Sequence, residues 1–298
     1  MRLRTAFSAL ALTAWATAVT LGAVTASASI AGTGQSGNLP GPFLRFAHGA
    51  RPRAGPAPTL STASKSAPPL LGPAPVRVWV PGFFSWALLD RSTGAMYGSA
   101  NSADTTTSTE SMIKIWIASD DLRRLPPDGA PDQYRLDELS RMIRDSDDSA
   151  AEDIYQQNGA DSVVQRMISM CDLAETSIAE GWWSRTEVSA RDAVRLGICI
   201  TDGRAAGPKW TSWVLGEMRQ VRGDGRFGIV DALPTPVATH IPIKNGWTVV
   251  GAEWRVNCLA VVDEYVLAVL TRYPEGLGLA YGADICRSVT AQLRTPAR

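Results

Sequence analysis

Ser111-Met112-Ile113-Lys114-Ile115-Trp116-Ile117 marks the point where a polar segment, Asp104 to Glu110, gives way to an apolar run. A helix from Ser111 to Leu125 would stack the Lys114 ammonium next to the Ser111 hydroxyl, because residues three apart lie on one face. A serine hydroxyl is a poor nucleophile until a neighbouring base takes its proton, and burial lowers the pKa of a lysine. The stretch therefore predicts a nucleophile and its proton acceptor, although a capping serine followed by a surface lysine has the same pattern.

A second polar motif, Ser146-Asp147-Asp148, lies between two predicted helices, Leu136 to Arg144 and Ser149 to Gln157. A short turn there would direct the Ser146 hydroxyl toward Lys114 and toward a leaving group. Serine and aspartate are also common helix caps, so this turn alone does not define a site.

A third motif, Lys244-Asn245-Gly246-Trp247, follows an expected strand from His240 to Ile243. Such a strand edge would place Lys244 near a substrate carboxylate, and Gly246 would let a substrate backbone approach closely. Taken alone it is an edge lysine and a turn. The order of the three motifs along the chain, two in the helical part and one on a late strand, is more specific than any one of them.

In this order the motifs resemble the Ser-x-x-Lys, Ser-Asp-Asn and Lys-Thr-Gly set of class A β-lactamases and penicillin-binding proteins. The resemblance runs from about Val76 to the C-terminus. It includes Leu89-Asp90-Arg91-Ser92-Thr93-Gly94, which matches an early hairpin turn, and Tyr265 to Thr271, which matches a late core strand. It implies a serine hydrolase without a cofactor or metal, acting on β-lactams or D-alanyl cell-wall peptides.

The resemblance also implies a role for each matched residue. Ser111 would be the acylated nucleophile and Lys114 its proton partner. Ser146 would pass a proton to the leaving group, and Lys244 would be an electrostatic clamp. The backbone N–H groups of Ser111 and Trp247 would form the oxyanion hole.

Two motif positions and one loop depart from the family pattern. Asp148 stands where Asn is usual, and an ionised carboxylate cannot donate a hydrogen bond to the side-chain amide of a β-lactam. Asn245 stands where Thr or Ser is usual and is longer than Thr, so the carboxylate pocket must be reshaped. The short loop after Cys171 lacks the Glu-x-x-x-Asn pattern that activates the deacylating water. Glu180 is either its replacement or a surface glutamate, and slow deacylation is expected.

Three other features of the sequence are candidates for the site. Arg255 is either a second anchor for a substrate carboxylate or a solvent-facing arginine. A Ser-His-Asp triad is disfavoured, because His240 is the one histidine of the domain and no Gly-x-Ser-x-Gly elbow occurs. Trp182 and Trp183 either pack in the helical part or line the cleft.

A different class of function stays open, that of a degenerate family member serving as a cell-envelope binding module. The retained serines and lysines favour the enzyme. The two substituted motif positions and the short loop favour the binding module.

The fold class expected is α+β, with one antiparallel sheet built from both termini, a terminal helix packed on it and an inserted all-helical lobe. Boundary signals include Ser189-x-x-Asp192, close to a capping box, and Gly159, a C-terminal stop. Apolar runs around the Asp90–Gly94 turn predict a hairpin. The expected helices are Ser111 to Leu125, Leu136 to Arg144, Ser149 to Gln157, Asp161 to Cys171, Ser189 to Thr201, Lys209 to Val221 and about Leu277 to Leu293. The expected strands are Val76 to Val80, Phe84 to Leu89, Ala95 to Tyr97, His240 to Ile243, Thr248 to Val262 with a break, and Tyr265 to Thr271.

The N-terminal part divides into two segments before the domain, which is expected over residues 76–298. Residues 1–28 have two arginines, an apolar run and an Ala-Ser-Ala exit, which predict a cleaved export signal rather than a membrane anchor. No cysteine follows the run, which argues against a lipid anchor. Residues 29–75 are rich in Pro, Gly and Ala and predict a disordered linker. We expect a secreted monomer with no membrane span after cleavage.

The charge of the chain and its cysteines indicate which binding partners, metal sites and disulfides to expect. The chain has 29 basic and 29 acidic side chains, so neither nucleic acid nor an anionic membrane is indicated. The four cysteines are far apart and have no metal-ligand spacing. In an exported protein they predict two bridges within lobes, Cys171–Cys199 and Cys258–Cys286, against the alternative of four buried thiols.

Overall fold

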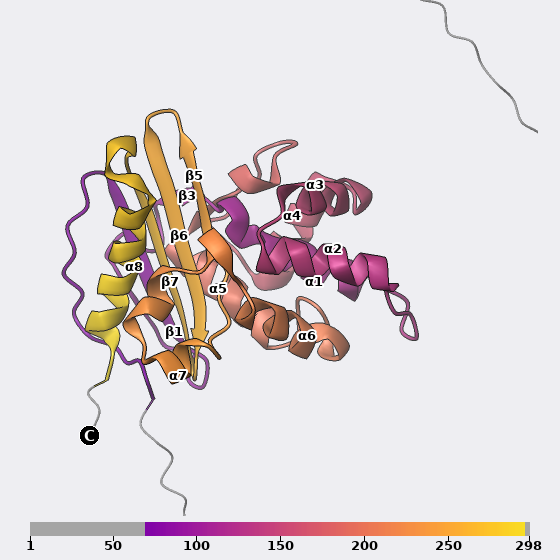
Figure 1. Cartoon of the computed structure of the whole chain (residues 1–298), viewed down its shortest axis with the longest axis horizontal. Coiled ribbons are helices and arrows are strands. Elements are labelled where there is room, and N and C mark those ends of the chain that lie inside the picture. Colours follow the sequence, from indigo (N-terminus) through magenta and orange to yellow (C-terminus); the bar gives the residue numbers. More distant parts are fainter. Residues whose placement is uncertain (1–68, 296–298) are drawn as a thin grey trace, which may run out of the picture. The chain divides into compact units, whose positions relative to one another are not determined.

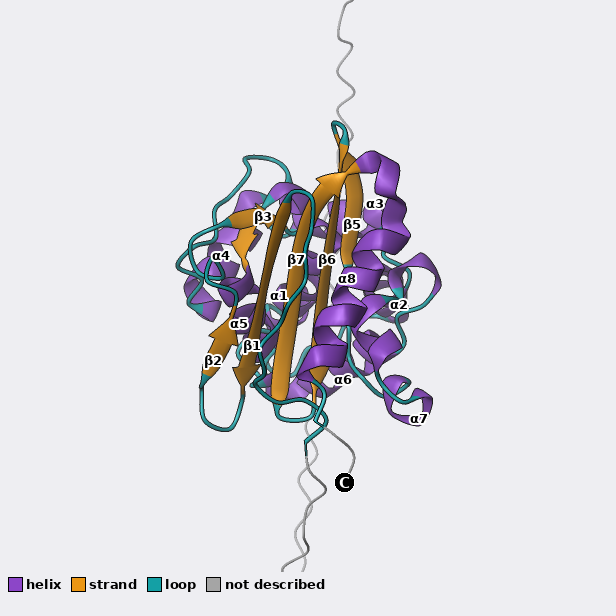
Figure 2. Cartoon of the chain, turned by 90° about the vertical axis from the view of Figure 1, so that its left-hand side faces the viewer, coloured by secondary structure: helices purple, strands orange, loops and turns teal. Residues whose placement is uncertain are grey.

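The computed structural model describes residues 69–295. The predicted export signal and residues 29–68 of the predicted linker lie outside this range. A five-stranded antiparallel sheet in the order β2-β1-β7-β6-β5 forms one half of the domain, and helices cover both of its faces (Figures 1 and 2). Its strands are β1 (Phe83–Asp90), β2 (Met96–Gly98), β5 (Gly246–Val250), β6 (Glu253–Val262) and β7 (Tyr265–Pro274).

The central strands of this sheet are buried on both sides. The C-terminal helix α8 (Gly278–Leu293) packs on β6, whereas α5 (Ala190–Thr201) packs on β1 and β7 from the opposite face. A strand covered on both faces needs apolar side chains at successive positions rather than at alternate ones. The runs Trp86–Leu89 and Val266–Leu270 meet this need and are almost wholly buried.

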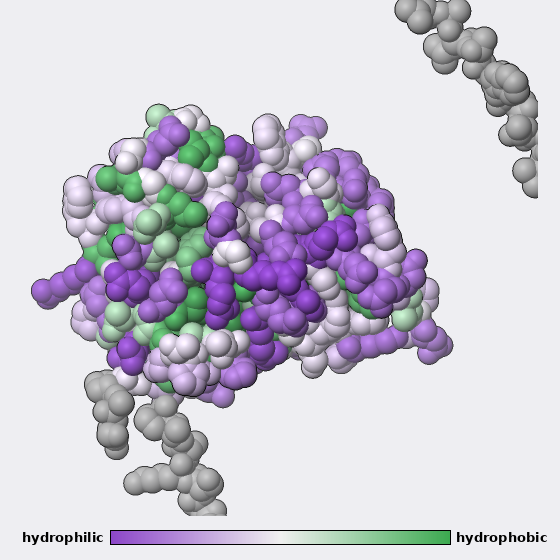
Figure 3. Space-filling model, in the orientation of Figure 1, coloured by the Kyte–Doolittle hydropathy of each residue, from purple (hydrophilic) through white to green (hydrophobic). Residues whose placement is uncertain are grey.

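The remaining helices form a lobe beside the sheet (Figure 1). Helix α1 is its axis, since Lys114 through Leu122 are all buried, and the surface of the lobe is mostly hydrophilic (Figure 3). The lobe helices are α1 (Lys114–Arg123), α2 (Gln133–Arg144), α3 (Asp148–Gln157), α4 (Asp161–Cys171) and α6 (Pro208–Arg219).

The α+β layout, the inserted lobe and the β1–β2 hairpin are as predicted. Each predicted helix is present to within a few residues at either end, and the first of them begins as a short 3₁₀ turn, Glu110–Ile113. Ser189 caps α5 by accepting the backbone N–H of Asp192, and Gly159 follows α3 with a left-handed φ of 94°. Local capping and turn chemistry thus set these boundaries.

Two expected strands are wrong. Residues 76–80 run extended along α8, where the Arg77 N–H donates to Gln292 Oε1 at 2.8 Å, and they join no sheet. Over His240 to Ile243 only Ile243 pairs, with Ala260, because the preceding residues continue the turn of α7 (Thr235–Ala238) and a proline at position 242 has no N–H to donate.

The packed part of the chain also begins before the predicted boundary at Val76. Leu71 is fully buried and pairs with Arg294, and the Gly72 N–H donates to the carbonyl of Leu293 at 2.9 Å. Apolar contact with the end of α8 thus holds a segment whose Pro-rich composition is typical of a linker. Within residues 69–295 none of the helices combines the length and apolar character needed to cross a bilayer.

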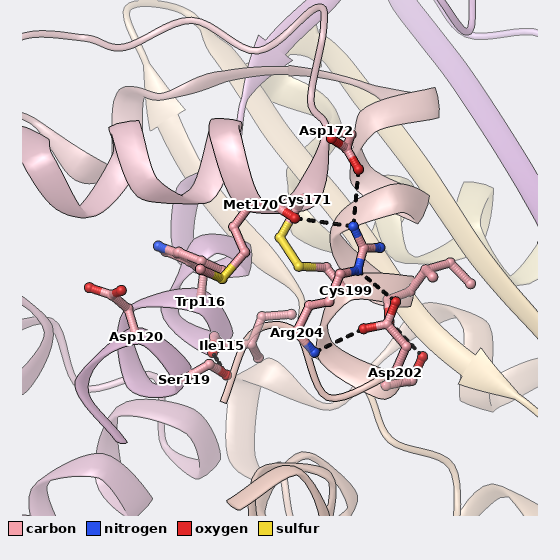
Figure 4. Close-up of a disulfide and its surroundings, with 12 residues drawn as sticks. Ile115, Trp116, Ser119, Asp120, Met170, Cys171, Asp172, Cys199, Asp202 and Arg204 are labelled. Atoms are coloured by element: carbon pink, nitrogen blue, oxygen red, sulfur yellow. Dashed lines mark hydrogen bonds and ion pairs between the residues drawn. A yellow bond between two sulfur atoms is a disulfide. The ribbon is translucent and has the colours of Figure 1, made fainter. Parts of the chain in front are cut away.

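Both predicted disulfides are present. Cys171–Cys199 joins the lobe helix α4 to α5, which packs on the sheet, and Cys258–Cys286 joins β6 to α8. Figure 4 shows the first bridge next to Arg204, whose guanidinium donates to the carbonyl of Met170. Each bridge therefore links two elements that pack against each other.

We predict that replacing Cys258 and Cys286 together by alanine lowers the free energy of unfolding by about 3 kcal/mol. The bridge spans a sequence separation of 28 residues, and in the chain-entropy model its loss frees the unfolded state of that constraint. Urea unfolding without reductant measures the loss, and the single variant Cys286→Ala is the matched control with a similar loss. A double variant as stable as the wild type would contradict the prediction.

Candidate active site

Ser111 lies in the 3₁₀ turn at the start of α1, where the lobe meets the sheet. Gly246, the first residue of β5, packs directly against this turn. A Cβ atom built on Gly246 would lie 2.4 Å from the carbonyl oxygen of Thr109, 2.8 Å from the nitrogen of Met112 and 2.9 Å from the nitrogen of Ser111. Only glycine allows this approach, so the sequence motif brings the backbone of β5 next to the amide of the predicted nucleophile.

Ser146 lies between the two lysines of the other motifs. The Lys114 ammonium donates to the Ser146 carbonyl and to Asp148 Oδ1, both at 2.5 Å, and lies 3.4 Å from Ser146 Oγ. The Lys244 ammonium donates to Ser146 Oγ at 2.9 Å and to the carbonyl of Asn245 at 3.2 Å. Three motifs far apart in the sequence therefore form one hydrogen-bonded cluster.

Both lysines of this cluster are fully buried, and burial disfavours their charged forms. Burial lowers the pKa of Lys114, while the hydrogen bond and charge of Asp148 oppose that shift. Burial, and then the neighbouring charge of Lys114, lower the pKa of Lys244 well below its usual range. Such an arrangement can keep one lysine neutral and ready to accept a proton from a hydroxyl.

A cleft of about 430 Å³ opens beside the cluster. Trp182 and Trp183 both line it, and the Lys114 ammonium lies 5.2 Å from the centre of a Trp183 ring. The lining also contains the two residues whose N–H groups the resemblance assigns to an oxyanion hole, Ser111 and Trp247. The full set is Glu110, Ser111, Asp148, Ser149, Glu152, Trp182, Trp183, Ser184, Arg185, Trp247 and Thr248.

Seven residues expected at the site do not line this cleft. Lys114, Ser146, Lys244 and Gly246 belong to the cluster and the packed turn described above, and the other three have contacts of their own. The Asn245 side chain is buried and donates to the carbonyls of Gly225 and Phe227, at 3.0 and 2.9 Å. The Arg255 guanidinium donates to Ser108 Oγ at 2.5 Å. Glu180 is exposed and forms no ion pair or side-chain hydrogen bond with any residue of the described range. Asn245 thus holds a neighbouring loop, and Arg255 belongs to the wall behind the cleft.

Two carboxylates of the cleft were not foreseen, Glu110 and Glu152. Glu110 directly precedes Ser111 and has a left-handed backbone, with φ of 50°. Glu110 is 4% exposed, and burial raises its pKa although Ser108 Oγ donates to it and Arg185 lies nearby. In the sequence, the one signal that Glu110 belongs to the site is its position next to Ser111. Across residues 69–295 no three His, Cys, Asp or Glu side chains are grouped as metal ligands.

We predict that Gly246→Ala lowers the free energy of unfolding by about 1–3 kcal/mol, since the added methyl group meets backbone atoms that cannot rotate away. Thermal and urea unfolding measure the change. Gly216→Ala on α6 is the matched control, because a Cβ there meets nothing within 4 Å, and we expect it to be neutral or slightly stabilising. Equal stability of the two variants would show that the approach of β5 is looser than described.

Comparison with known proteins supports the fold and gives few close relatives. No model of a protein family matches the sequence. The proteins named "Putative lipoprotein LppW" of Mycobacterium tuberculosis and Mycobacterium bovis are 29% identical over 227 residues, which cover 71% of this chain and 68% of theirs.

Solved structures match a similar share of this chain, and a larger share of their own, at lower identity. The extended-spectrum β-lactamase TLA-3 superposes with a TM-score of 0.58 at 13% identity, over 71% of this chain and 93% of that one. A β-lactamase from Xanthomonas campestris pv. campestris superposes with a TM-score of 0.57 at 14% identity, over 72% of this chain and 92% of that one. Related neighbours include an ancestral class A β-lactamase. The described part of the chain therefore has the fold of the class A β-lactamases.

Proposed function

We propose that this chain is an extracytoplasmic serine acyl-transfer hydrolase. Its substrate would be a β-lactam or a D-alanyl cell-wall peptide, and its intermediate a Ser111 ester. The observation that carries the proposal is the Ser146 hydroxyl within hydrogen-bond reach of Lys244, and 3.4 Å from Lys114, beside a cleft that Ser111 lines.

The groups of the cluster suit each step of acyl transfer. Neutral Lys114 takes the proton of Ser111 as its oxygen attacks the substrate carbonyl. The developing oxyanion accepts the N–H groups of Ser111 and Trp247. As the carbon–nitrogen bond breaks, Ser146 delivers a proton to the leaving nitrogen and regains one from Lys114. Lys244 would hydrogen-bond the substrate carboxylate, whose negative charge raises the pKa of this buried lysine and so favours its charged form.

Deacylation has less support than acylation. The loop residues that line the cleft are Trp182 to Arg185, none of which has a carboxylate, and Glu180 is exposed outside it. The cleft carboxylates Glu110 and Glu152 come from other elements, and each accepts hydrogen bonds from neighbouring side chains. A positioned general base typically supplies about 10²–10⁴-fold in rate. We therefore propose that the Ser111 ester hydrolyses slowly, so that the protein acts more like a penicillin-binding protein than like a β-lactamase.

The predicted export signal and the lipoprotein name of the mycobacterial relatives support a place outside the cytoplasm. We propose that the protein acts there as a monomer. Its partner would be a small molecule or a peptidoglycan peptide, and not nucleic acid.

A second candidate, a binding module without turnover, is favoured by one contact. The 2.5 Å ion pair with Asp148 stabilises the charged form of Lys114, which is the form that cannot accept a proton. In that case ligands would bind in the cleft and Ser111 would stay unmodified.

We predict that a fluorescent penicillin labels the wild type covalently and that Ser111→Ala abolishes labelling. The adduct should persist for many minutes because no loop carboxylate activates water. Intact-mass measurement and peptide mapping locate the adduct, and Ser140→Ala on α2 is the control that keeps it. An adduct on the alanine variant, or on another serine, would contradict the nucleophile. Rapid release that disappears in Glu180→Gln would contradict slow deacylation.

We predict that Asp148→Asn shifts the pH dependence of acylation to lower pH. The rate rises as Lys114 loses its proton, and the negative charge of Asp148 raises the pKa of that lysine. Without this charge the lysine becomes neutral at lower pH. Stopped-flow acylation between pH 5 and 10 measures the shift, with Asp153→Asn as a control of equal charge change. A profile that stays in place, or moves to higher pH, would show that Lys114 is not the titrating base.

A further inference from the structure

The cleft contains one positively charged and three negatively charged side chains. Arg185 is the cation, and its guanidinium lies 3.5 Å from Glu110 Oε1. Asp148 and Glu152 come from successive turns of α3 and line the side of the cleft opposite β5. Lys114 lies behind Asp148, fully buried. The surface that a ligand meets is therefore richer in carboxylates than in cations.

Glu110 keeps one oxygen free despite its burial. Its hydrogen bonds with Ser108 and Arg185 both involve Oε1. Oε2 has no hydrogen-bond partner within residues 69–295, yet it is not among the atoms buried without a partner. Glu110 is 4% exposed and lines the cleft next to Ser111, and Oε2 is its oxygen without a hydrogen bond in the described range.

Glu152 has no cationic partner in the described range. Its oxygens accept only neutral donors, Trp183 Nε1 at 2.9 Å and Gln156 Nε2 at 2.8 Å. Asp148 gives one oxygen to Lys114, and its side chain is 81% exposed. Beside them Trp182 leaves 59% of its surface in solvent, and its ring already holds the Arg185 guanidinium 5.4 Å from its centre, because aromatic rings attract cations. The carboxylate oxygens of Asp148 and Glu152 and the exposed ring of Trp182 together form a surface suited to bind a positively charged group of a ligand.

We propose that this cleft selects acyl donors that carry an ammonium or a similar cationic N–H donor on the acyl group, received by Glu110, Asp148 and Glu152 beside Trp182. The inference rests on the proposed acylation of Ser111 and narrows its substrate class. The proposal also explains a role for Asp148 in place of the usual Asn, since a carboxylate accepts the hydrogen bonds that an ammonium donates.

Three penicillins with one nucleus test the selectivity, with α-aminobenzyl, benzyl and α-carboxybenzyl side chains. The second-order acylation rate constant of each is divided by its hydrolysis rate in hydroxide, which removes differences in intrinsic reactivity. We expect the normalised constant of the ammonium compound to exceed that of the carboxylate compound by about tenfold, with benzylpenicillin between them. The ratio should shrink at 1 M salt, because screening weakens exposed charge pairs.

Variants assign the effect to the cleft. Glu152→Gln should reduce the tenfold ratio to about threefold, since it removes one of the carboxylates. Asp153→Asn should leave the ratio unchanged, because Asp153 is exposed on the same helix but lines a different hollow, beside Asp121 and Tyr134. An equal effect of both variants would indicate net charge rather than a site and would overturn the inference.

Binding to Ser111→Ala separates this inference from the proposed function. Calorimetry compares Nα-acetyl-L-lysyl-D-alanyl-D-alanine with the same peptide acetylated at Nε, which has no ammonium. We expect the ammonium peptide to bind about tenfold more tightly. Acylation by all three penicillins at one normalised rate would overturn the selectivity and leave the hydrolase. Absence of acylation would overturn the hydrolase, and the peptide pair would still decide the selectivity. Equal binding of the two peptides, or no binding of either, would overturn the proposed selectivity for an ammonium group.

Discussion

Two lysine amino groups are removed from water where the sheet meets the helical lobe, and their hydrogen bonds must be satisfied there. A buried charge without partners costs several kcal/mol, so the surrounding backbone adapts to the lysines. Ser146 shows the adaptation. Its φ of 60° is left-handed, which costs a residue with a side chain of order 1–3 kcal/mol. In this conformation its carbonyl receives Lys114 while its hydroxyl receives Lys244.

The same requirement fixes the contact between the two halves of the domain. Lys244 comes from the strand edge and Ser146 from the lobe, so the pair forms only when both halves lie in one arrangement. Gly246 and Asn257 reinforce it on the sheet side, the first by close packing against the Ser111 turn and the second by donating to the carbonyl of Ser108 at 2.7 Å. Precision at the candidate site is thus a property of the whole interface.

Much of the fold followed from local signals. Apolar spacing and capping residues such as Ser189 located the helices, and the order of the three motifs predicted which distant residues meet. The residues whose positions differ from the prediction are held by contacts between distant segments, which a local sequence pattern does not show. Asn245 turns toward Gly225 and Phe227, and Arg255 pairs with Ser108 across a separation of 147 residues. The short strands β3 (Thr106–Ser108) and β4 (Glu187–Ser189) were missed because three residues are too few to show the alternation of a strand.

The sheet draws its strands from both ends of the chain, and this order has a consequence in time. During synthesis β1 appears early, but β7, with which it pairs along its whole length, is made last among the strands. Contacts between distant segments form late, because the loop between them must close first. The helical lobe, whose contacts are local, can fold while the sheet is still open. A chain interrupted before Lys244 would hold Ser111 and Lys114 without the strand that completes their surroundings. The candidate site around Ser111 is thereby incomplete until almost the entire polypeptide has been made and folded.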